Sequence, residues 1–243
     1  MDELVIAAMA RWPNVPDVFG WLSLNSQGHW RLHPEGDALA PAPDGTPGPG
    51  VPVSSLRINQ FINRNYARDP LGQWYFQNGP QRVFVRLDAA PFIFHTTQTG
   101  RPQPELLAHN GQQAGKVSRW ILDEQGRLFV DAQPGPGLIS GRDLEQVLDS
   151  LFTESGRPVF DLLDGLDLFG TPAASAPDAA DQAGVPATGK SDKPGKPGQE
   201  LDPLAHVGWA DGPRAPLYFC HFERIPDLLG YVRFPGPQSG ICA

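Results

Sequence analysis

Apolar and polar residues alternate through much of the first two thirds of the chain, a pattern that predicts short β-strands. The clearest case is a pair of alternating runs joined at Asn78-Gly79-Pro80. Side chains point to opposite faces along a strand, so one face of this ribbon should be largely apolar. That face comprises Trp74, Phe76, Val83, Val85 and Leu87. The other face comprises Tyr75, Gln77, Arg82, Phe84 and Arg86.

The turn of this ribbon carries two opposing signals. Asn-Gly favours a tight two-residue turn, because both residues tolerate positive φ. Pro80 has no N–H and disfavours the helical region at Gly79, so we expect a longer loop over residues 78–81. The outer face carries the large rings of Tyr75 and Phe84, so either a second layer of this chain or a partner should cover it.

Two further hairpins are predicted, over residues 20–32 and 117–131, with turns at 25–28 and 123–126. Single strands are expected at 91–97 and 106–109, whereas residues 34–52 and Gly135-Pro136-Gly137 are interpreted as loops. Each hairpin has a tryptophan in its first strand and a glycine in its turn, but the spacing between them varies. Internal duplication and three ordinary hairpins both stay open.

Helical periodicity predicts three short helices. The first spans residues 2–12, with two acids at its start and Pro13 after its end. The second follows Ser54 or Ser55, either of which can cap it, and extends through Asn65 and Tyr66. The third spans residues 143–152. The fold class is therefore α+β and β-dominated, with antiparallel hairpins forming a sheet or partly open barrel beside two or three short helices.

A change of composition divides the chain into three parts. Residues 1–167 form a β-rich core domain with short helices. Residues 168–203 are rich in Ala, Pro and Gly, bury too little apolar surface to offset ordering, and are predicted to be a disordered linker. Residues 204–243 contain predicted strands at 216–222 and 231–234 and a helical turn at 225–229. So small a piece rarely folds alone, and we expect it to dock onto the core domain.

Charge and motifs exclude several function classes. The formal net charge of −8 over 243 residues opposes general binding to nucleic acid or an anionic membrane. No apolar run approaches the roughly 18 residues of a membrane helix, and the amino terminus lacks a secretory pattern. The six histidines show no metal-ligand spacing, and nucleotide-binding loops are missing. We therefore expect a cytoplasmic protein with no cofactor, no metal, no nucleic-acid partner and no membrane.

Cysteine chemistry is limited to two residues, Cys220 and Cys242. Two thiols do not make a disulfide framework. Cys220 would need a base and an electropositive pocket to act as a nucleophile, so a packed structural thiol is the favoured interpretation.

A group of amide, arginine and tyrosine side chains near the central ribbon is the candidate ligand-binding set. Its members are Asn63, Arg64, Asn65, Tyr66, Gln77 and Arg82. Such groups recognise carboxylates, phosphates or sugars through bidentate hydrogen bonds beside an aromatic ring. The structural alternative is that residues at the end of a helix cap its carbonyl groups. No catalytic residue can be named.

The string RNYARDPLGQWYFQNGPQRVFV, with residues 12–21, resembles the conserved block of an uncharacterised bacterial family of unknown function. The resemblance covers residues 12–21 and 62–87. It implies a bacterial cytoplasmic protein and supplies no catalytic residue.

Two functional hypotheses follow. The first is a non-enzymatic cytoplasmic interaction module whose aromatic ribbon binds a protein partner or a second copy. The second is a small enzyme or ligand-binding protein with a polar pocket near Arg64, Tyr66 and Arg82. An enzyme should show a closed cavity with convergent polar groups, whereas an interaction module should show an exposed apolar patch.

Overall fold

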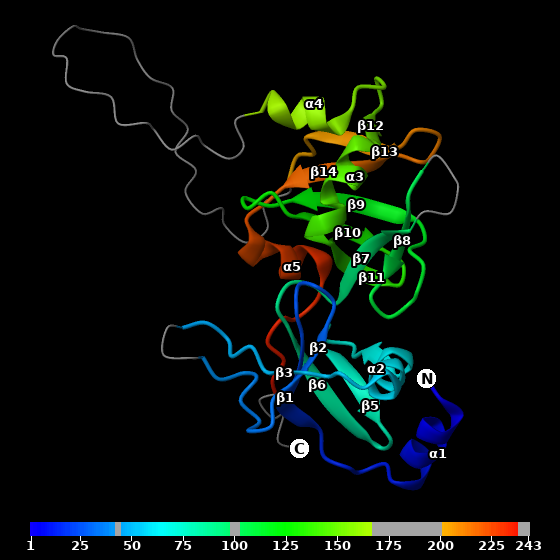
Figure 1. Ribbon diagram of the computed structural model, residues 1–243, viewed down its shortest axis with the longest axis vertical. Helices are drawn as coiled ribbons and strands as arrows, with labels where there is room; N and C mark the ends of the chain where they lie inside the picture. Colours follow the sequence, from blue (N-terminus) through cyan, green and yellow to red (C-terminus); the bar gives the residue numbers. More distant parts are fainter. Residues whose placement is uncertain (42–44, 98–102, 167–200, 238–243) are drawn as a thin grey trace, which may run out of the picture.

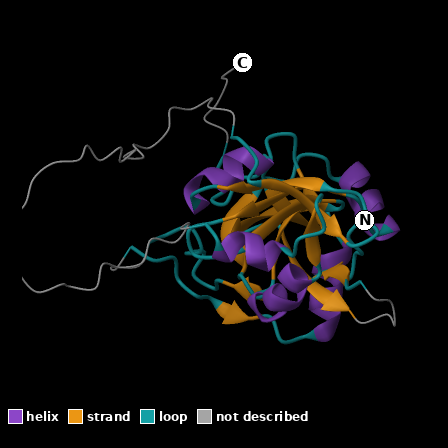
Figure 2. Cartoon of the chain, turned by 90° about the horizontal axis from the view of Figure 1, so that it is seen from above, coloured by secondary structure: helices purple, strands orange, loops and turns teal. Residues whose placement is uncertain are grey.

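Two mixed β-sheets form the body of the protein, with five α-helices among the described residues (Figure 1). The computed structural model describes residues 1–41, 45–97, 103–166 and 201–237. One sheet is a curled half-barrel, and the helices lie around the outside of the strands (Figure 2). The predicted β-dominated α+β class is confirmed. Two details differ: the sheets contain parallel as well as antiparallel pairs, and the helices outnumber the two or three expected.

The first sheet has six strands in the order β3-β2-β1-β6-β5-β4. Its strands are β1 (Val18–Leu24), β2 (Trp30–Leu32), β3 (Val51–Pro52), β4 (Tyr66–Arg68), β5 (Trp74–Asn78) and β6 (Gln81–Leu87). The predicted hairpins β1–β2 and β5–β6 are confirmed, and β1 joins them by pairing in parallel with β6. Helices α1 (Glu3–Arg11) and α2 (Leu56–Arg64) belong to this part of the molecule. None of the helices in the described ranges is long and apolar enough to cross a membrane.

The second sheet has eight strands in the order β12-β13-β14-β9-β10-β11-β7-β8. Its strands are β7 (Phe92–Thr97), β8 (Glu105–Ala108), β9 (Val117–Leu122), β10 (Leu128–Ala132), β11 (Gly135–Ile139), β12 (Leu151–Thr153), β13 (Ala205–Trp209) and β14 (Ala215–Phe219). The accompanying helices are α3 (Leu144–Asp149), α4 (Val159–Asp164) and α5 (Ile225–Leu229), with 3₁₀ turns η1 (Gly141–Asp143) and η2 (Phe222–Arg224). The predicted hairpin β9–β10 is confirmed.

The β5–β6 turn contains two residues, so the predicted longer loop is wrong. Asn78 pairs with Gln81, which leaves only Gly79 and Pro80 between the strands. Gly79 has a φ of 60°, a conformation outside the helical region that Pro80 disfavours. A positive φ in the first central residue followed by the fixed φ of proline suits a tight hairpin.

Other segments of the same chain cover part of the outer face of this ribbon. The ring of Phe19 stacks on Phe84 with centroids 4.6 Å apart. Arg86 is only 1% exposed, and its guanidinium donates to the carbonyl oxygens of Ala38 at 2.6 Å and Gly48 at 3.0 Å. It also donates to Asp88 Oδ1 at 3.1 Å. Arg86 therefore anchors the segment between β2 and β3 onto the sheet.

The interpretation of Gly135-Pro136-Gly137 as a loop is wrong, because these residues begin β11. This strand pairs with β10 on one side and with β7 on the other. A Cβ atom on Gly137 would lie 2.4 Å from the ring of Phe94, so glycine lets β11 approach β7. The glycines that suggested a loop in fact permit close strand packing.

Three predicted element boundaries also need correction. The second helix ends at Arg64, and Tyr66 starts β4 instead. The third helix ends at Asp149, and residues 151–153 form β12, which pairs with β13. Residues 231–234 are not a strand: Tyr231 is buried and donates to the Ala89 carbonyl at 2.8 Å. In each case a contact with a distant segment outweighs the local pattern.

An aromatic cluster joins the two sheets. Trp74 is buried, and its ring lies 4.9 Å from Tyr66 and 5.0 Å from Phe92. The ring of Trp30 lies 5.1 Å from Tyr66 and 5.4 Å from His109. Since Trp30, Tyr66 and Trp74 come from the first sheet and Phe92 from the second, the apolar core is continuous between them.

The predicted division into domains stays a prediction. Most of the predicted linker lies outside the described residues, which resume at Leu201. After that point β14 pairs in parallel with β9, and β13 pairs with β14 and β12. Residues 205–219 are therefore part of the eight-stranded sheet.

Candidate functional site

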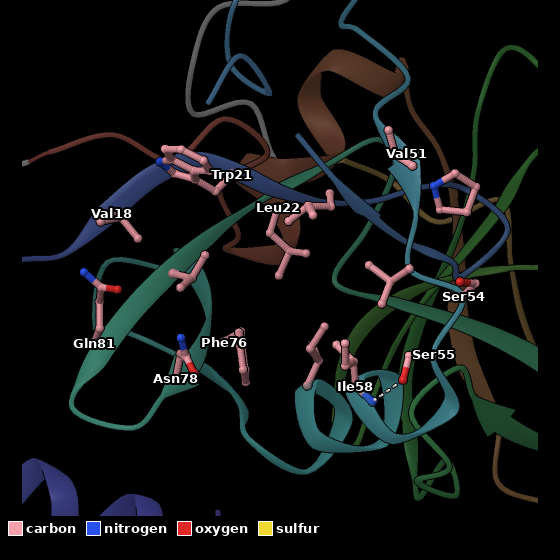
Figure 3. A pocket seen from close by; sticks show the side chains of 15 residues that line it. Val18, Trp21, Leu22, Val51, Ser54, Ser55, Ile58, Phe76, Asn78 and Gln81 are labelled. Atoms are coloured by element: carbon pink, nitrogen blue, oxygen red, sulfur yellow. Dashed lines mark hydrogen bonds between the residues drawn. The ribbon is translucent and has the colours of Figure 1, made fainter. Parts of the chain in front are cut away.

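An apolar cavity of about 670 Å³ opens between helix α2, strand β3 and one face of the six-stranded sheet (Figure 3). Its lining residues are Val18, Trp21, Leu22, Leu32, Val51, Pro52, Val53, Ser54, Ser55, Ile58, Ile62, Phe76, Asn78, Gln81 and Val83. We call this space the α2 cavity.

Local structure places these side chains around one space. Phe76 and Asn78 are two residues apart on β5, so they point to the same face of the sheet. On α2, Ile58 and Ile62 are four residues apart and therefore lie on the same side of the helix. The Ser55 hydroxyl accepts the Ile58 N–H at 3.4 Å, as the dashed line in Figure 3 shows, and caps the helix at this end.

The lining of the α2 cavity contains no ionisable side chain. Its polar side-chain groups are the hydroxyls of Ser54 and Ser55, the amides of Asn78 and Gln81, and the indole N–H of Trp21. Several apolar side chains remain accessible there: Trp21 is 44% exposed, Ile58 52% and Val51 53%. The cavity therefore offers an apolar surface with a few uncharged hydrogen-bonding groups and no acid or base.

The predicted ligand-binding residues at the end of α2 make contacts within the protein. Asn63 Oδ1 accepts the indole N–H of Trp30 at 2.7 Å. Arg64 Nε lies 3.1 Å from Asp2 Oδ1, and this hydrogen bond is the main cause of the lowered pKa of Asp2. Asn65 is buried and accepts the Asp2 backbone N–H at 2.8 Å. These contacts join the start of α1 to the end of α2.

Tyr66 has a different location from the rest of the predicted set. Its hydroxyl donates to the Pro91 carbonyl at 3.2 Å, within the aromatic cluster. Burial raises the pKa of this phenol well above its ordinary value. Tyr66 therefore links the two sheets.

Gln77 and Arg82 do lie together. They line a second cavity, of about 620 Å³, with residues 12–17 of the α1–β1 connection. Gln77 is buried and its amide nitrogen donates to the Gly79 carbonyl at 2.9 Å, whereas the exposed Arg82 guanidinium lies 5.3 Å from the centre of the Tyr75 ring. The structure thus brings only two of the six predicted residues into one cavity, and a ligand-binding role for the set stays a prediction.

None of the six predicted ligand-binding residues lines the α2 cavity. Alternation predicts an apolar face on β5 and β6, and residues 51 and 52 form β3 although the sequence predicts a loop there. Periodicity shows that a face is apolar, but it does not show whether another element fills the space beside it. Ile58 and Ile62 lie one turn apart on α2, and this spacing is the local signal for an apolar side of the helix.

The described ranges contain neither a metal-binding site nor a reactive thiol. Within residues 1–41, 45–97, 103–166 and 201–237, no three His, Cys, Asp or Glu side chains are grouped to hold a metal ion. Cys220 is buried, and burial raises the pKa of its thiol. Its Sγ donates to the His221 carbonyl at 3.4 Å. A raised pKa keeps the thiol protonated and a poor nucleophile.

Comparison with known proteins places the chain in a family. A model of the family DUF2944, described as "Protein of unknown function (DUF2946)", matches residues 1–235. The chain belongs to this family. The predicted resemblance to an uncharacterised family of unknown function is confirmed. Among curated proteins no sequence matches the chain.

Two crystal structures of DUF1285 family proteins are similar in part. The protein from Silicibacter pomeroyi DSS-3 has 18% identity and a TM-score of 0.40, over 63% of this chain and 87% of its own. The protein from Shewanella baltica OS155 has 12% identity and a TM-score of 0.34, over 52% of this chain and 89% of its own.

Proposed function

We propose that this DUF2944 family member is a non-enzymatic cytoplasmic binding module that takes a small, uncharged, mainly apolar ligand into the α2 cavity. One observation carries the proposal: the cavity is open, apolar and free of ionisable side chains. Catalysis of proton transfer needs a positioned acid or base, which this lining does not supply. A buried free thiol at Cys220 is in keeping with a reducing compartment.

The size of the cavity fits the proposal. About 670 Å³ lies within the range of roughly 300–1,000 Å³ typical of small-molecule sites. A ligand that buries about 300 Å² of apolar surface gains ~7 kcal/mol at about 25 cal/mol per Å². Since ~7 kcal/mol corresponds to a dissociation constant of about 10 μM and part of that gain offsets the cost of association, we expect a dissociation constant above about 10 μM.

A charge introduced into the cavity tests the proposal. A neutral fluorescent probe, N-phenyl-1-naphthylamine, should bind saturably to the full chain. Ile58→Glu places a carboxylate in the apolar lining and should weaken probe binding at least about tenfold, because an unpaired charge is costly to bury. The matched control is Leu56→Glu, since Leu56 lies on the same helix, is 70% exposed and does not line the cavity.

The control should bind the probe within about twofold of the unaltered protein, a difference of ~0.4 kcal/mol. Circular dichroism and thermal melting establish that both variants are folded. Equal affinity for Ile58→Glu and Leu56→Glu would refute the α2 cavity as the site. Probe affinity that falls as protein concentration rises would identify a second copy of this chain as the occupant.

The alternative function is recognition of a polar ligand by Gln77 and Arg82 in the second cavity. Its support is that Gln77 Oε1 is buried and accepts no hydrogen bond from any described residue. A buried acceptor without a donor is costly, and a ligand N–H or O–H would satisfy it. Loss of polar-ligand binding in Arg82→Ala, with unchanged binding in Ile58→Glu, would favour this alternative.

A further inference from the structure

A third cavity, of about 500 Å³, lies where the two sheets meet and differs from the α2 cavity in its chemistry. The β1–β2 turn supplies one wall, and β7, the β9–β10 turn, β11, η1 and the start of α3 supply the rest. Its lining residues are Ser26, Gln27, His29, His95, Arg127, Leu138, Ile139, Ser140, Gly141, Arg142 and Leu144. We call this space the junction cavity.

The β1–β2 turn is held firmly at this junction. Asn25 Oδ1 accepts the backbone N–H groups of Gln27 at 3.1 Å and His29 at 2.8 Å, which fixes the shape of the turn. A Cβ atom on Gly28 would lie 2.7 Å from the Cβ of His109, so the turn packs directly against the second sheet. His29 is thus brought from the first sheet to a cavity built largely by the second.

Charge sets the junction cavity apart from the rest of the molecule. Its lining contains two arginines and two histidines and no aspartate or glutamate. The chain as a whole has a formal net charge of −8. Every ionisable side chain in this lining is an arginine or a histidine, so the concave surface offers N–H donors to an anion.

Asp143, just behind the lining, positions two of these groups. Its Oδ2 lies 3.1 Å from His95 Nδ1 and 3.3 Å from Arg142 Nε. Its Oδ1 accepts the Thr96 hydroxyl at 2.9 Å. Burial opposes ionisation of Asp143, but the hydrogen bonds from Thr96, His95 and Arg142 outweigh burial and lower its pKa. The ionised carboxylate accepts from His95 Nδ1–H, which leaves Nε2 without a partner among the described residues.

Arg127 forms a fixed wall of the cavity. Its Nε donates to the buried carboxylate of Asp123 at 2.7 Å, and its guanidinium lies 4.0 Å from the centre of the Phe222 ring. Asp123 neutralises much of its charge. Arg142 is different, because its side chain is 73% exposed beside the cavity, with Nη2 3.3 Å from His95 Nδ1.

We propose that the junction cavity binds an oxyanion carried on a carbon skeleton, a phosphate ester or a carboxylate. Arg142, His29 and His95 hold the anionic group through charge-assisted hydrogen bonds. The apolar side chains of Leu138, Ile139 and Leu144 contact the skeleton. This site is separate from the α2 cavity, so it is a second binding activity beyond the proposed function.

Calorimetric titration of the full chain with three probes tests the site at pH 6.5 and low ionic strength. The probes are phenyl phosphate, inorganic phosphate and benzoate. Phenyl phosphate should bind at least about fivefold more tightly than inorganic phosphate, because its ring reaches the apolar wall. The order of phenyl phosphate and benzoate shows whether the site prefers phosphate or carboxylate.

Matched charge variants locate the site. Arg142→Gln should weaken phenyl phosphate binding about tenfold. Arg57→Gln makes the same change of charge at an exposed position on α2 and should bind within about twofold of the unaltered protein. The NMR signals of the His29 and His95 rings should shift during the titration, each assigned by its glutamine variant.

Four results would overturn the proposal. One is the absence of binding by all three probes at millimolar concentration. The second is equal affinity for Arg142→Gln and Arg57→Gln, and the third is histidine signals that do not move. The fourth is loss of phenyl phosphate binding in Ile58→Glu, which would locate the anion at the α2 cavity. If Ile58→Glu weakens binding of N-phenyl-1-naphthylamine but not of phenyl phosphate, the junction cavity is a binding site independent of the proposed function.

Discussion

His109 should make the protein lose stability as the pH falls below neutrality. Its ring is enclosed in the aromatic cluster, 5.4 Å from Trp30 and 5.9 Å from Phe92. Its Nδ1 accepts the Ile93 backbone N–H at 3.3 Å. Burial, with a smaller contribution from His95, lowers the pKa of His109 from 6.5 to about 3.

The sign and size of the effect follow from this pKa. The folded protein keeps His109 neutral down to about pH 3, whereas the unfolded chain takes up a proton near pH 6.5. The unfolded state therefore binds more protons between these values, and the free energy of unfolding falls as the pH falls. At 1.36 kcal/mol per pH unit, lowering the pH to about 5 costs ~2 kcal/mol. The full loss towards pH 3 approaches ~5 kcal/mol.

Urea titrations between pH 5 and pH 7.5 measure this effect, with His109→Asn as the test variant. Asparagine does not titrate, and its Oδ1 can still accept the Ile93 N–H. His33 also has a pKa lowered by burial, but it is present in both proteins and cancels in the comparison. His206→Asn is the matched control, because His206 is exposed.

His109→Asn is expected to be less stable at pH 7.5, through lost ring contacts, and to depend less steeply on pH by ~2 kcal/mol over this range. His206→Asn should retain the full dependence. If the unaltered protein and His109→Asn lose the same free energy between pH 7.5 and 5, His109 is not a buried neutral histidine and the reasoning fails.

The remaining predictions concern stability, and urea titration at pH 7.5 checks each of them. Trp74→Ala should cost about 3–5 kcal/mol through lost burial, whereas the exposed Arg82→Ala should change stability by less than about 0.5 kcal/mol; similar costs would contradict the assignment of Arg82 to the surface. Arg86→Ala should cost about 3–5 kcal/mol, because it leaves buried carbonyl and carboxylate groups unpaired, and a cost near that of Arg82→Ala would argue against this anchor. Gly137→Ala should cost about 1–3 kcal/mol by forcing the Phe94 ring aside, and a neutral result would mean that β11 is not so close to β7.

The hairpins were largely determined by the sequence alone, because turn chemistry is local. Asn25 and Asp123 each begin a turn, accept backbone N–H groups two and four residues later, and precede a glycine with positive φ. Alternation then assigns each side chain to a face of its strand. The same local logic narrowed the cap of α2 to Ser54 or Ser55, and the structure shows that Ser55 caps the helix. None of these features needs a distant segment.

Only the tertiary structure determined which distant segments each strand and side chain contacts. β1 pairs with β6, and β14 with β9, through hydrogen bonds between segments far apart in the chain, and no local pattern encodes such partners. Asn63 and Asn65 are joined to Trp30 and Asp2 for the same reason, so residues that suggested ligand recognition make structural contacts.

The cavities are likewise a property of the assembled fold. An apolar face of β5 and β6 is consistent with a filled core or with an open cavity, and only the placement of α2 beside it leaves the space lined by Ile58 and Phe76. His29 and His95 are far apart in sequence, and they line one cavity only because the β1–β2 turn packs on the second sheet. Periodicity specifies which side of an element is apolar or charged, whereas the packing of elements against one another determines whether that side is buried, open or shared.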